Sequence, residues 1–224
     1  MAKPYVMRQA SSADLDTVLG ILQERIEWLR DRGSDQWTQG KDFGECLEPR
    51  IARGQTWLAE DDGEPIATIT IRRFANPAFW TPDERQDKAL YATKTATTLA
   101  RSGAGLAAMM LRWVQNRAAE REMSYLRWDV WRTNRQLQAY YQSLGATLVR
   151  TVEAEGIPSG ALFQVQPVLH DLSSEWITEF DEDRRKMLAD RAAAALAAEE
   201  AGAPAAGAQL VGAGVSAGSG PDRS

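Results

Sequence analysis

Histidine and cysteine are almost absent from this sequence. Its 224 residues include one histidine, His170, and one cysteine, Cys46. A single cysteine forms no intrachain disulfide, which fits a reducing compartment, so we expect a cytoplasmic protein. The same scarcity argues against a zinc site built from these residue types and against triads that need a histidine base. The sequence therefore predicts neither a metal centre nor a histidine-activated nucleophile.

Long apolar runs and a surplus of positive charge are missing as well. No uncharged apolar segment approaches the roughly 20 residues that span a bilayer, and Met1 to Arg8 lacks the apolar core of a secretory signal. The formal net charge is −5, with both signs scattered along the chain, so there is no basic stripe for nucleic-acid phosphates. We expect no membrane and no nucleic-acid partner. The mildly acidic balance weakly favours cationic small molecules such as amines.

The hydrophobic pattern predicts an α/β (α+β) domain with a mixed, mainly antiparallel central sheet flanked by helices. Apolar residues recur at helical spacing from Leu15 to Leu29. The turn at Asp61 to Glu64 indicates an antiparallel hairpin. The expected strands are 5–10, 56–60, 66–72, 90–98, 125–131, 147–153 and 161–165, and the later helices are 106–122 and 135–143.

Composition divides the chain into three parts. We expect a folded domain over residues 1–170, a solvated helix over 171–199 and a disordered tail over 200–224. Ala and Gly dominate the tail. Such a segment has few large apolar side chains to offset the entropy lost on ordering.

A glycine-rich turn joins strand 90–98 to helix 106–122. Gly103 and Gly105 let the backbone bend tightly and approach a ligand. The first N–H groups of the helix have no partner within the helix, and together with the helix dipole they favour a phosphate group. The simplest alternative is a connection that binds nothing.

The same turn also fits a dinucleotide-binding fingerprint. Gly103, Gly105 and Ala108 match the spacing, and Asp129 lies about the right distance downstream. That fold requires parallel strands with crossover helices on both sides of the motif, whereas an antiparallel hairpin precedes the turn here. A dinucleotide-binding oxidoreductase is therefore the weaker alternative.

A second pattern follows strand 125–131. Tyr141 lies seven residues after Asn134, and Gly145 lies four residues after Tyr141. With the glycine turn, this arrangement resembles the GNAT acetyltransferases over roughly residues 5–166. The family's motif, Gln/Arg-x-x-Gly-x-Gly/Ala, falls on the stretch Ser102-Gly103-Ala104-Gly105-Leu106-Ala107. Ser102 departs from it, since a long polar side chain is usual at the start of the motif.

The resemblance implies the acyl-CoA N-acyltransferase (GNAT) fold, in which two strands separate to admit acetyl-CoA. It implies transfer of an acetyl group to a primary amine of a small molecule by direct attack, without a metal. Tyr141 would then donate a proton to the departing thiolate. Many relatives are dimers, so a homodimer is expected too. The implied cofactor-binding residues are Thr95, Ala96, Thr97, Ser102, Gly103, Ala104, Gly105, Leu106, Ala107, Asn134 and Tyr141.

Several side-chain roles stay open at the level of sequence. Asn134 fits a helix cap as well as a cofactor ligand. Asp129 is a candidate general base, although an exposed or salt-bridged aspartate is commoner. Trp37, Phe79 and Trp80 stand in loop-like segments and are candidates for lining an acceptor pocket. A further alternative for the whole chain is a non-catalytic module that binds acyl-CoA and regulates.

Overall fold

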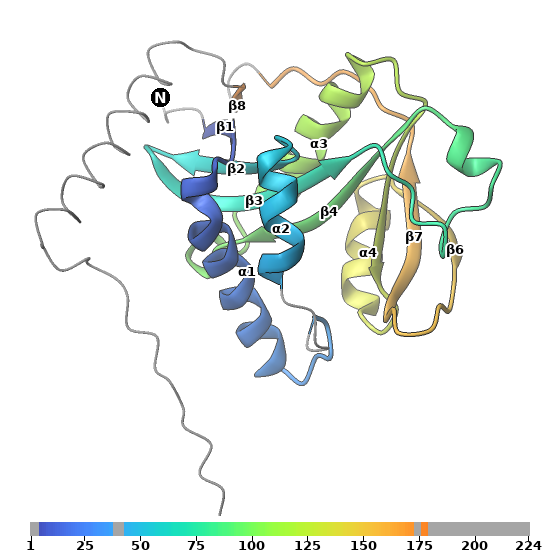
Figure 1. Cartoon of the computed structure of the whole chain (residues 1–224), viewed down its shortest axis with the longest axis horizontal. Helices are drawn as coiled ribbons and strands as arrows, with labels where there is room; N and C mark the ends of the chain where they lie inside the picture. Colours follow the sequence, from blue (N-terminus) through green and yellow to red (C-terminus); the bar gives the residue numbers. More distant parts are fainter. Residues whose placement is uncertain (1–4, 38–42, 173–175, 179–224) are drawn as a thin grey trace, which may run out of the picture. The chain divides into compact units, whose positions relative to one another are not determined.

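The computed structural model describes residues 5–37, 43–172 and 176–178, which form one sheet with helices on both faces (Figure 1). The strand order is β6-β7-β5-β4-β3-β2-β1-β8. Neighbours are antiparallel except for the pairs β4·β5 and β1·β8. The strands are β1 Tyr5–Gln9, β2 Thr56–Asp61, β3 Glu64–Arg72, β4 Ala89–Thr97, β5 Tyr125–Trp131, β6 Thr147–Thr151, β7 Ser159–Val165 and β8 Trp176–Thr178. The predicted mixed, mainly antiparallel sheet is confirmed.

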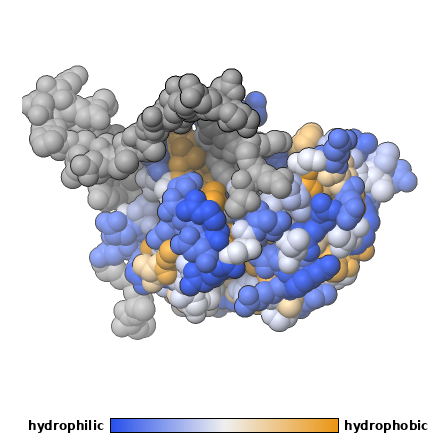
Figure 2. All heavy atoms as spheres, turned by 90° about the horizontal axis from the view of Figure 1, so that it is seen from below, coloured by the Kyte–Doolittle hydropathy of each residue, from blue (hydrophilic) through white to orange (hydrophobic). Residues whose placement is uncertain are grey.

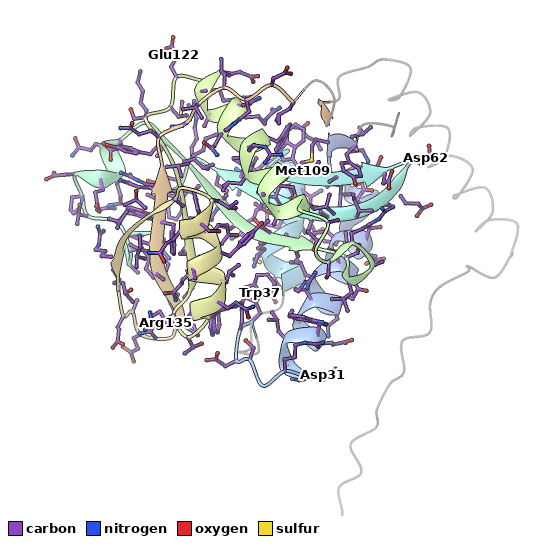
Figure 3. All side chains as sticks on the ribbon, turned by 180° about the vertical axis from the view of Figure 1, so that it is seen from behind. Asp31, Trp37, Asp62, Met109, Glu122 and Arg135 are labelled. Atoms are coloured by element: carbon purple, nitrogen blue, oxygen red, sulfur yellow. The ribbon has the colours of Figure 1, made fainter. Side chains whose placement is uncertain are left out.

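Four α-helices within the described residues cover the sheet. α1 (Leu15–Arg30) and α2 (Phe43–Ala52) lie on one face, and α3 (Leu106–Ala119) and α4 (Arg135–Ser143) lie on the other (Figures 1 and 3). α1, α2 and α3 bury apolar side chains along one face, and Leu137 and Tyr141 of α4 are partly buried against the same core as α3. None of the helices in the described ranges has the length and apolar character that crossing a bilayer takes.

Two buried clusters hold these layers together. Trp113 of α3 packs against Trp57 of β2 with ring centroids 5.0 Å apart, inside the cluster beneath α3 and α4. Val18 and Leu22 of α1 pack with Leu58 of β2 on the opposite face. From below, the surface is largely hydrophilic, with hydrophobic areas separated from one another (Figure 2). The apolar side chains are thus used mainly between the sheet and its helices.

The two parallel central strands pair over only part of their length. Ala89–Ala92 of β4 pairs with Tyr125–Trp128 of β5, but β4 continues to Thr97 and β5 continues to Trp131. On its other side, β4 carries a bulge opposite β3. Thr93 pairs with Thr70 and Ala96 pairs with Thr68, so β4 has one more residue than β3 over this stretch. Lys94 lies in this bulge with φ 52°. A bulge bends its strand and re-aims side chains, so β4 diverges from β5 here.

The chain after residue 170 differs from the expectation where it is described. Trp176–Thr178 forms the short strand β8, parallel to β1, in the range expected to be a solvated helix. The outer edge of β1 presents backbone N–H and C=O groups, and pairing with them outweighs local helical preference. The rest of 173–199 and the expected tail over 200–224 lie outside the described residues.

Candidate active site

Two adjoining cavities open where β4 and β5 separate. The turn cavity, of about 500 Å³, extends from the glycine turn to α4. The strand cavity, of about 330 Å³, lies between the diverging ends of β4 and β5. Both cavities are lined by Gln36, Trp37, Thr95, Ala107, Leu137 and Tyr141. A molecule extending from one cavity into the other passes Tyr141.

The turn cavity brings together nearly all of the residues predicted to bind a cofactor. Ala104 belongs to the same turn but does not line the cavity. The predicted residues along its wall are Thr95, Ala96, Thr97, Ser102, Gly103, Gly105, Leu106, Ala107, Asn134 and Tyr141. They come from β4, the glycine turn, the start of α3 and α4.

The glycine turn leaves the start of α3 open. Gly105 is the N-cap residue of α3 with φ 74°, and Gly103 has φ 80°. Among the described residues, no atom lies within 4 Å of the position that a Cβ would take at either glycine. No side chain in the described part of the chain caps the helix. The first amides of α3 therefore border a cavity with the polarity that suits an anion.

Arg25 of α1 is a residue of this site that the sequence reading missed. Its Nη2 donates to the carbonyl of Thr97 at 2.7 Å, to Thr97 Oγ1 at 2.9 Å and to Ser102 Oγ at 3.2 Å. Burial lowers the pKa of Arg25. In the sequence Arg25 is only a charged residue outside the apolar stripe of α1. Its role could not be predicted because its hydrogen-bond partners lie 72 and 77 residues away. Arg25 places a long cationic side chain beside Ser102, where the motif lacks one.

Two tyrosines of α4 face the turn cavity. The Tyr141 ring lies 5.2 Å from Trp128, 5.9 Å from Phe163 and 5.7 Å from Tyr140. Burial raises the pKa of Tyr141 to about 12, so its phenol is protonated near neutral pH. Burial also raises the pKa of Tyr140, against a hydrogen bond with the Ala108 backbone. Tyr141, which reaches both cavities, is the better placed of the two for chemistry.

Asn134 caps α4 and also contacts the segment after α1. Its Oδ1 accepts from the Leu137 N–H at 2.9 Å, and its Nδ2 donates to Gln36 Oε1 at 2.7 Å. The neighbouring Asp35 accepts from Trp131 Nε1 at 2.8 Å and from Thr133 Oγ1 at 2.7 Å. These bonds connect residues 34–37 to the start of α4. The cap predicted for Asn134 is confirmed.

Three aromatic residues were candidates for lining an acceptor pocket, and one of them lines the two cavities. Trp37 borders both cavities and lies between the end of α1, marked by Asp31, and the start of α4, marked by Arg135 (Figure 3). Phe79 and Trp80 instead belong to a buried cluster that contains Tyr91. For those two the prediction is wrong, because large aromatic rings in a loop can gain more from burial than from lining a cavity.

Asp129 and Lys94 carry the charge of the strand cavity. Burial raises the pKa of the Asp129 carboxyl, while a hydrogen bond from Ser159 and the nearby charges of Arg72 and Lys94 oppose this in part. Burial lowers the pKa of Lys94 to about 8. A carboxyl with a raised pKa beside a cavity is a stronger base than an ordinary aspartate.

No group of three or more His, Cys, Asp or Glu residues within the described ranges is placed to hold a metal ion. The side chains that line the two cavities offer proton transfer and hydrogen bonding. His170 lies at neither cavity; its backbone exchanges hydrogen bonds with the Asn116 side chain at 2.7 and 2.8 Å.

Comparison with known proteins places this geometry in context. A model of the acetyltransferase (GNAT) family matches residues 22–146. The chain is 27% identical over 139 residues to YesJ of Bacillus subtilis (strain 168), which is named as an uncharacterized N-acetyltransferase; the match covers 59% of this chain and 76% of YesJ.

Solved structures show the same fold. A GNAT-family acetyltransferase from Listeria monocytogenes 4b F2365 superposes with a TM-score of 0.61 at 24% identity, covering 72% of this chain and 94% of its own. The structure of yncA from Salmonella typhimurium is described as that of the protein with its cofactor acetyl-CoA. It superposes with a TM-score of 0.54 at 15% identity, covering 75% of this chain and 96% of yncA.

Proposed function

This chain belongs to the GNAT family of acetyltransferases, and we propose that it transfers the acetyl group of acetyl-CoA to a primary amine of a small molecule. The observation that carries the proposal is the meeting of the two cavities at Tyr141, between the unpaired ends of β4 and β5. A structural neighbour, the Salmonella yncA protein, is described with acetyl-CoA as its cofactor.

In this proposal the turn cavity holds the coenzyme. The amides from Gly103 to Ala107 bind the diphosphate, and the guanidinium of Arg25 adds a charge-assisted contact. The pantetheine arm lies along Thr95–Thr97, where β4 has no partner on the β5 side, and its amides pair with the strand backbone. Asn134 contributes to the same wall.

The amine enters from the strand cavity and attacks the thioester carbon directly. Its ammonium form first gives a proton to Asp129, and the free amine then forms the new C–N bond while the C–S bond breaks. A backbone N–H of β4 polarises the carbonyl as negative charge builds on its oxygen. The leaving sulfur takes a proton from Tyr141, and Tyr141 and Asp129 regain their starting protonation by exchange with water.

The raised pKa of Tyr141 constrains this last step. A phenol with a pKa of about 12 is a weaker acid than a free thiol with a pKa of about 8.5. The phenol therefore acts first as a hydrogen-bond donor to the sulfur, and its proton moves as the C–S bond breaks. It also stays protonated at alkaline pH, so Tyr141 itself causes no loss of rate up to about pH 10.

Release of free thiol from acetyl-CoA across a panel of primary amines tests the proposal. We expect amine-dependent release, and we expect Tyr141→Phe to lower kcat by about 100-fold with little change in acetyl-CoA affinity. Tyr125→Phe is the matched control, since Tyr125 lines neither cavity. An unchanged kcat in Tyr141→Phe removes the acid role.

Ser102 gives one specific reason to keep a second candidate, because it removes a side chain that is usual in the motif. If acetyl-CoA binds but no amine on the panel releases thiol, the chain is a non-catalytic acyl-CoA-binding module. A cytoplasmic location and a homodimer stay predictions.

A further inference from the structure

Two charged side chains line the strand cavity, and two more from neighbouring elements lie close enough to act on them. Lys94 of β4 and Asp129 of β5 line its wall, and the charge of Arg72, at the end of β3, acts on both. Arg50 of α2 acts on Lys94 and Arg72, and its Nη1 lies 3.5 Å from Cys46 Sγ. Cys46 is in turn a hydrogen-bond partner of Lys94. The charges of Arg72 and Lys94 thus act on the Asp129 carboxylate, and Arg50 acts on both of these cations.

The strand register shows that this cluster lies on one face of the sheet. Arg72 is opposite Tyr91, and Tyr91 is opposite Arg127. Alternate residues of a strand share a face, so Arg72, Thr93 and Asp129 point to the same side. Thr68 of β3 alternates onto the same face as Arg72 and is opposite Leu58, which packs against α1 and α2, so this is the face that α1 and α2 cover.

Two donors in this cluster are buried and unused. Arg72 Nε and Thr93 Oγ1 have no hydrogen-bond partner within the described residues. A buried polar group without a partner destabilises the fold, and a surplus of buried positive charge destabilises it more. Both costs fall if an anionic group of a ligand occupies the cavity.

We propose that the amine acetylated by this protein also carries a carboxylate, as an amino acid does. This inference rests on the function proposed above and names the substrate class for the same site. The carboxylate lies against Lys94 and Thr93, which line the cavity, and the nearby guanidinium of Arg72 adds to the attraction through its charge. The ammonium faces Asp129. The local charge of the cavity thus differs from the net charge of −5 of the whole chain.

This arrangement does more than select a substrate. Because the carboxylate is held at the end of the cavity nearest β3, the amine lies at a fixed distance from it, toward β5. There it is close to Asp129. Such orientation lowers the barrier by removing freedom before the reaction. Arg72 and Lys94 are therefore assigned as specificity-determining residues.

Matched pairs of compounds test the inference. Each common L-amino acid is assayed beside its carboxamide, which keeps the amine and the side chain but loses the negative charge. We expect the best acid to exceed its carboxamide in kcat/KM by about tenfold to a hundredfold. Lys94→Met should reduce this ratio to near one while Lys94→Arg retains it, and Arg72→Met should reduce it in part.

Arg73→Met is the matched control. Arg73 is the next residue, is exposed, and loses the same charge, so the acid-to-carboxamide ratio should stay at the wild-type value. A carboxamide preference in the wild type, or the same ratio in Arg72→Met and Arg73→Met, overturns the inference and leaves the acetyltransferase proposal standing.

A second readout separates the two proposals. In the presence of CoA, which cannot react, thermal shifts measure the binding of the same acids and carboxamides. Acid-selective stabilisation without any acetyl transfer contradicts the proposed function but supports the substrate class. Acetyl transfer to amines without acid-selective stabilisation or turnover contradicts the substrate class alone.

Discussion

Arg25 is the single residue whose removal tests the coenzyme site most selectively. It lines the turn cavity, and its bonds to Thr97 and Ser102 hold the guanidinium beside the glycine turn. A hydrogen bond to a charged group contributes about 1.5–3 kcal/mol. Arg25→Met should therefore weaken acetyl-CoA binding by about tenfold to a hundredfold, measured by titration calorimetry.

Arg30→Met provides the comparison on the same helix, since the Arg30 side chain is 63% exposed. We expect wild-type affinity for acetyl-CoA in that variant. Equal losses in both variants would mean that general charge, and not the position of Arg25, attracts the coenzyme.

We expect Asp129 to lower the stability of the fold while it supports the reaction. Burial raises its pKa in the folded protein, so its contribution to stability is fully present below the unfolded pKa of about 3.9 and is lost as pH rises through the folded value. At pH 7.5, Asp129→Asn should therefore raise the Tm while lowering kcat. Thermal unfolding as a function of pH measures this, and the difference in Tm should shrink as the pH approaches 4.

A lower Tm for Asp129→Asn at pH 7.5 would show that Asp129 serves mainly to neutralise Arg72 and Lys94. A wild-type kcat in the same variant would remove its role as the base.

At the scale of elements, the start of α3 depends on two residues with positive φ. Gly105 has φ 74°, and no described atom lies within 4 Å of its Cβ position, so a Gly105→Ala substitution meets strain but no clash. The left-handed conformation costs a residue with a Cβ about 1–2 kcal/mol. We expect that loss of unfolding free energy in denaturant titrations, together with weaker acetyl-CoA binding.

Gly20→Ala is the opposite case within α1. No described atom lies within 4 Å of its Cβ position either, and its φ is not positive. Ala is favoured over Gly inside a helix by about 0.5–1 kcal/mol, so this variant should be more stable than the wild type. Destabilisation of both variants to the same degree would contradict the role assigned to φ at Gly105.

The start of α4 separates the two roles of Asn134. Asn134→Ala loses the cap on the Leu137 N–H and should cost about 1 kcal/mol. Asn134→Asp keeps an oxygen for that amide but loses the Nδ2 donor that contacts Gln36. In denaturant titrations, the free energy of unfolding should be near the wild-type value for Asn134→Asp and lower for Asn134→Ala. Equal losses would show that the Gln36 contact, not the cap, stabilises this end.

Elements whose ends are marked by nearby residues in the sequence were predicted well. Features that depend on residues far apart in the sequence were missed. The bounds of α4 were predicted correctly, because Asn134 caps its start and Gly145, with φ 85°, follows its end. The bulge at Lys94 has no such signal, since lysine is not a residue type that favours positive φ. Arg25 and β8 were missed because their partners lie far away along the chain.

At the scale of the whole sheet, the account depends on the separation of β4 from β5. Pairing ends at Ala92 and Trp128 while the α3 turn opens beside the unpaired ends. The order of elements predicted a mixed sheet, but periodicity carries no information on where two strands stop pairing. That feature came from the family resemblance, and the structure supports it through the register of β4 and β5.

The most direct test of the central claim compares the calorimetric affinity of acetyl-CoA with that of S-acetylpantetheine, which keeps the thioester arm but lacks the diphosphate. If the amides at the start of α3 and Arg25 hold the diphosphate, acetyl-CoA should bind at least about tenfold more tightly. Equal affinities, or no heat with either compound, would contradict the account.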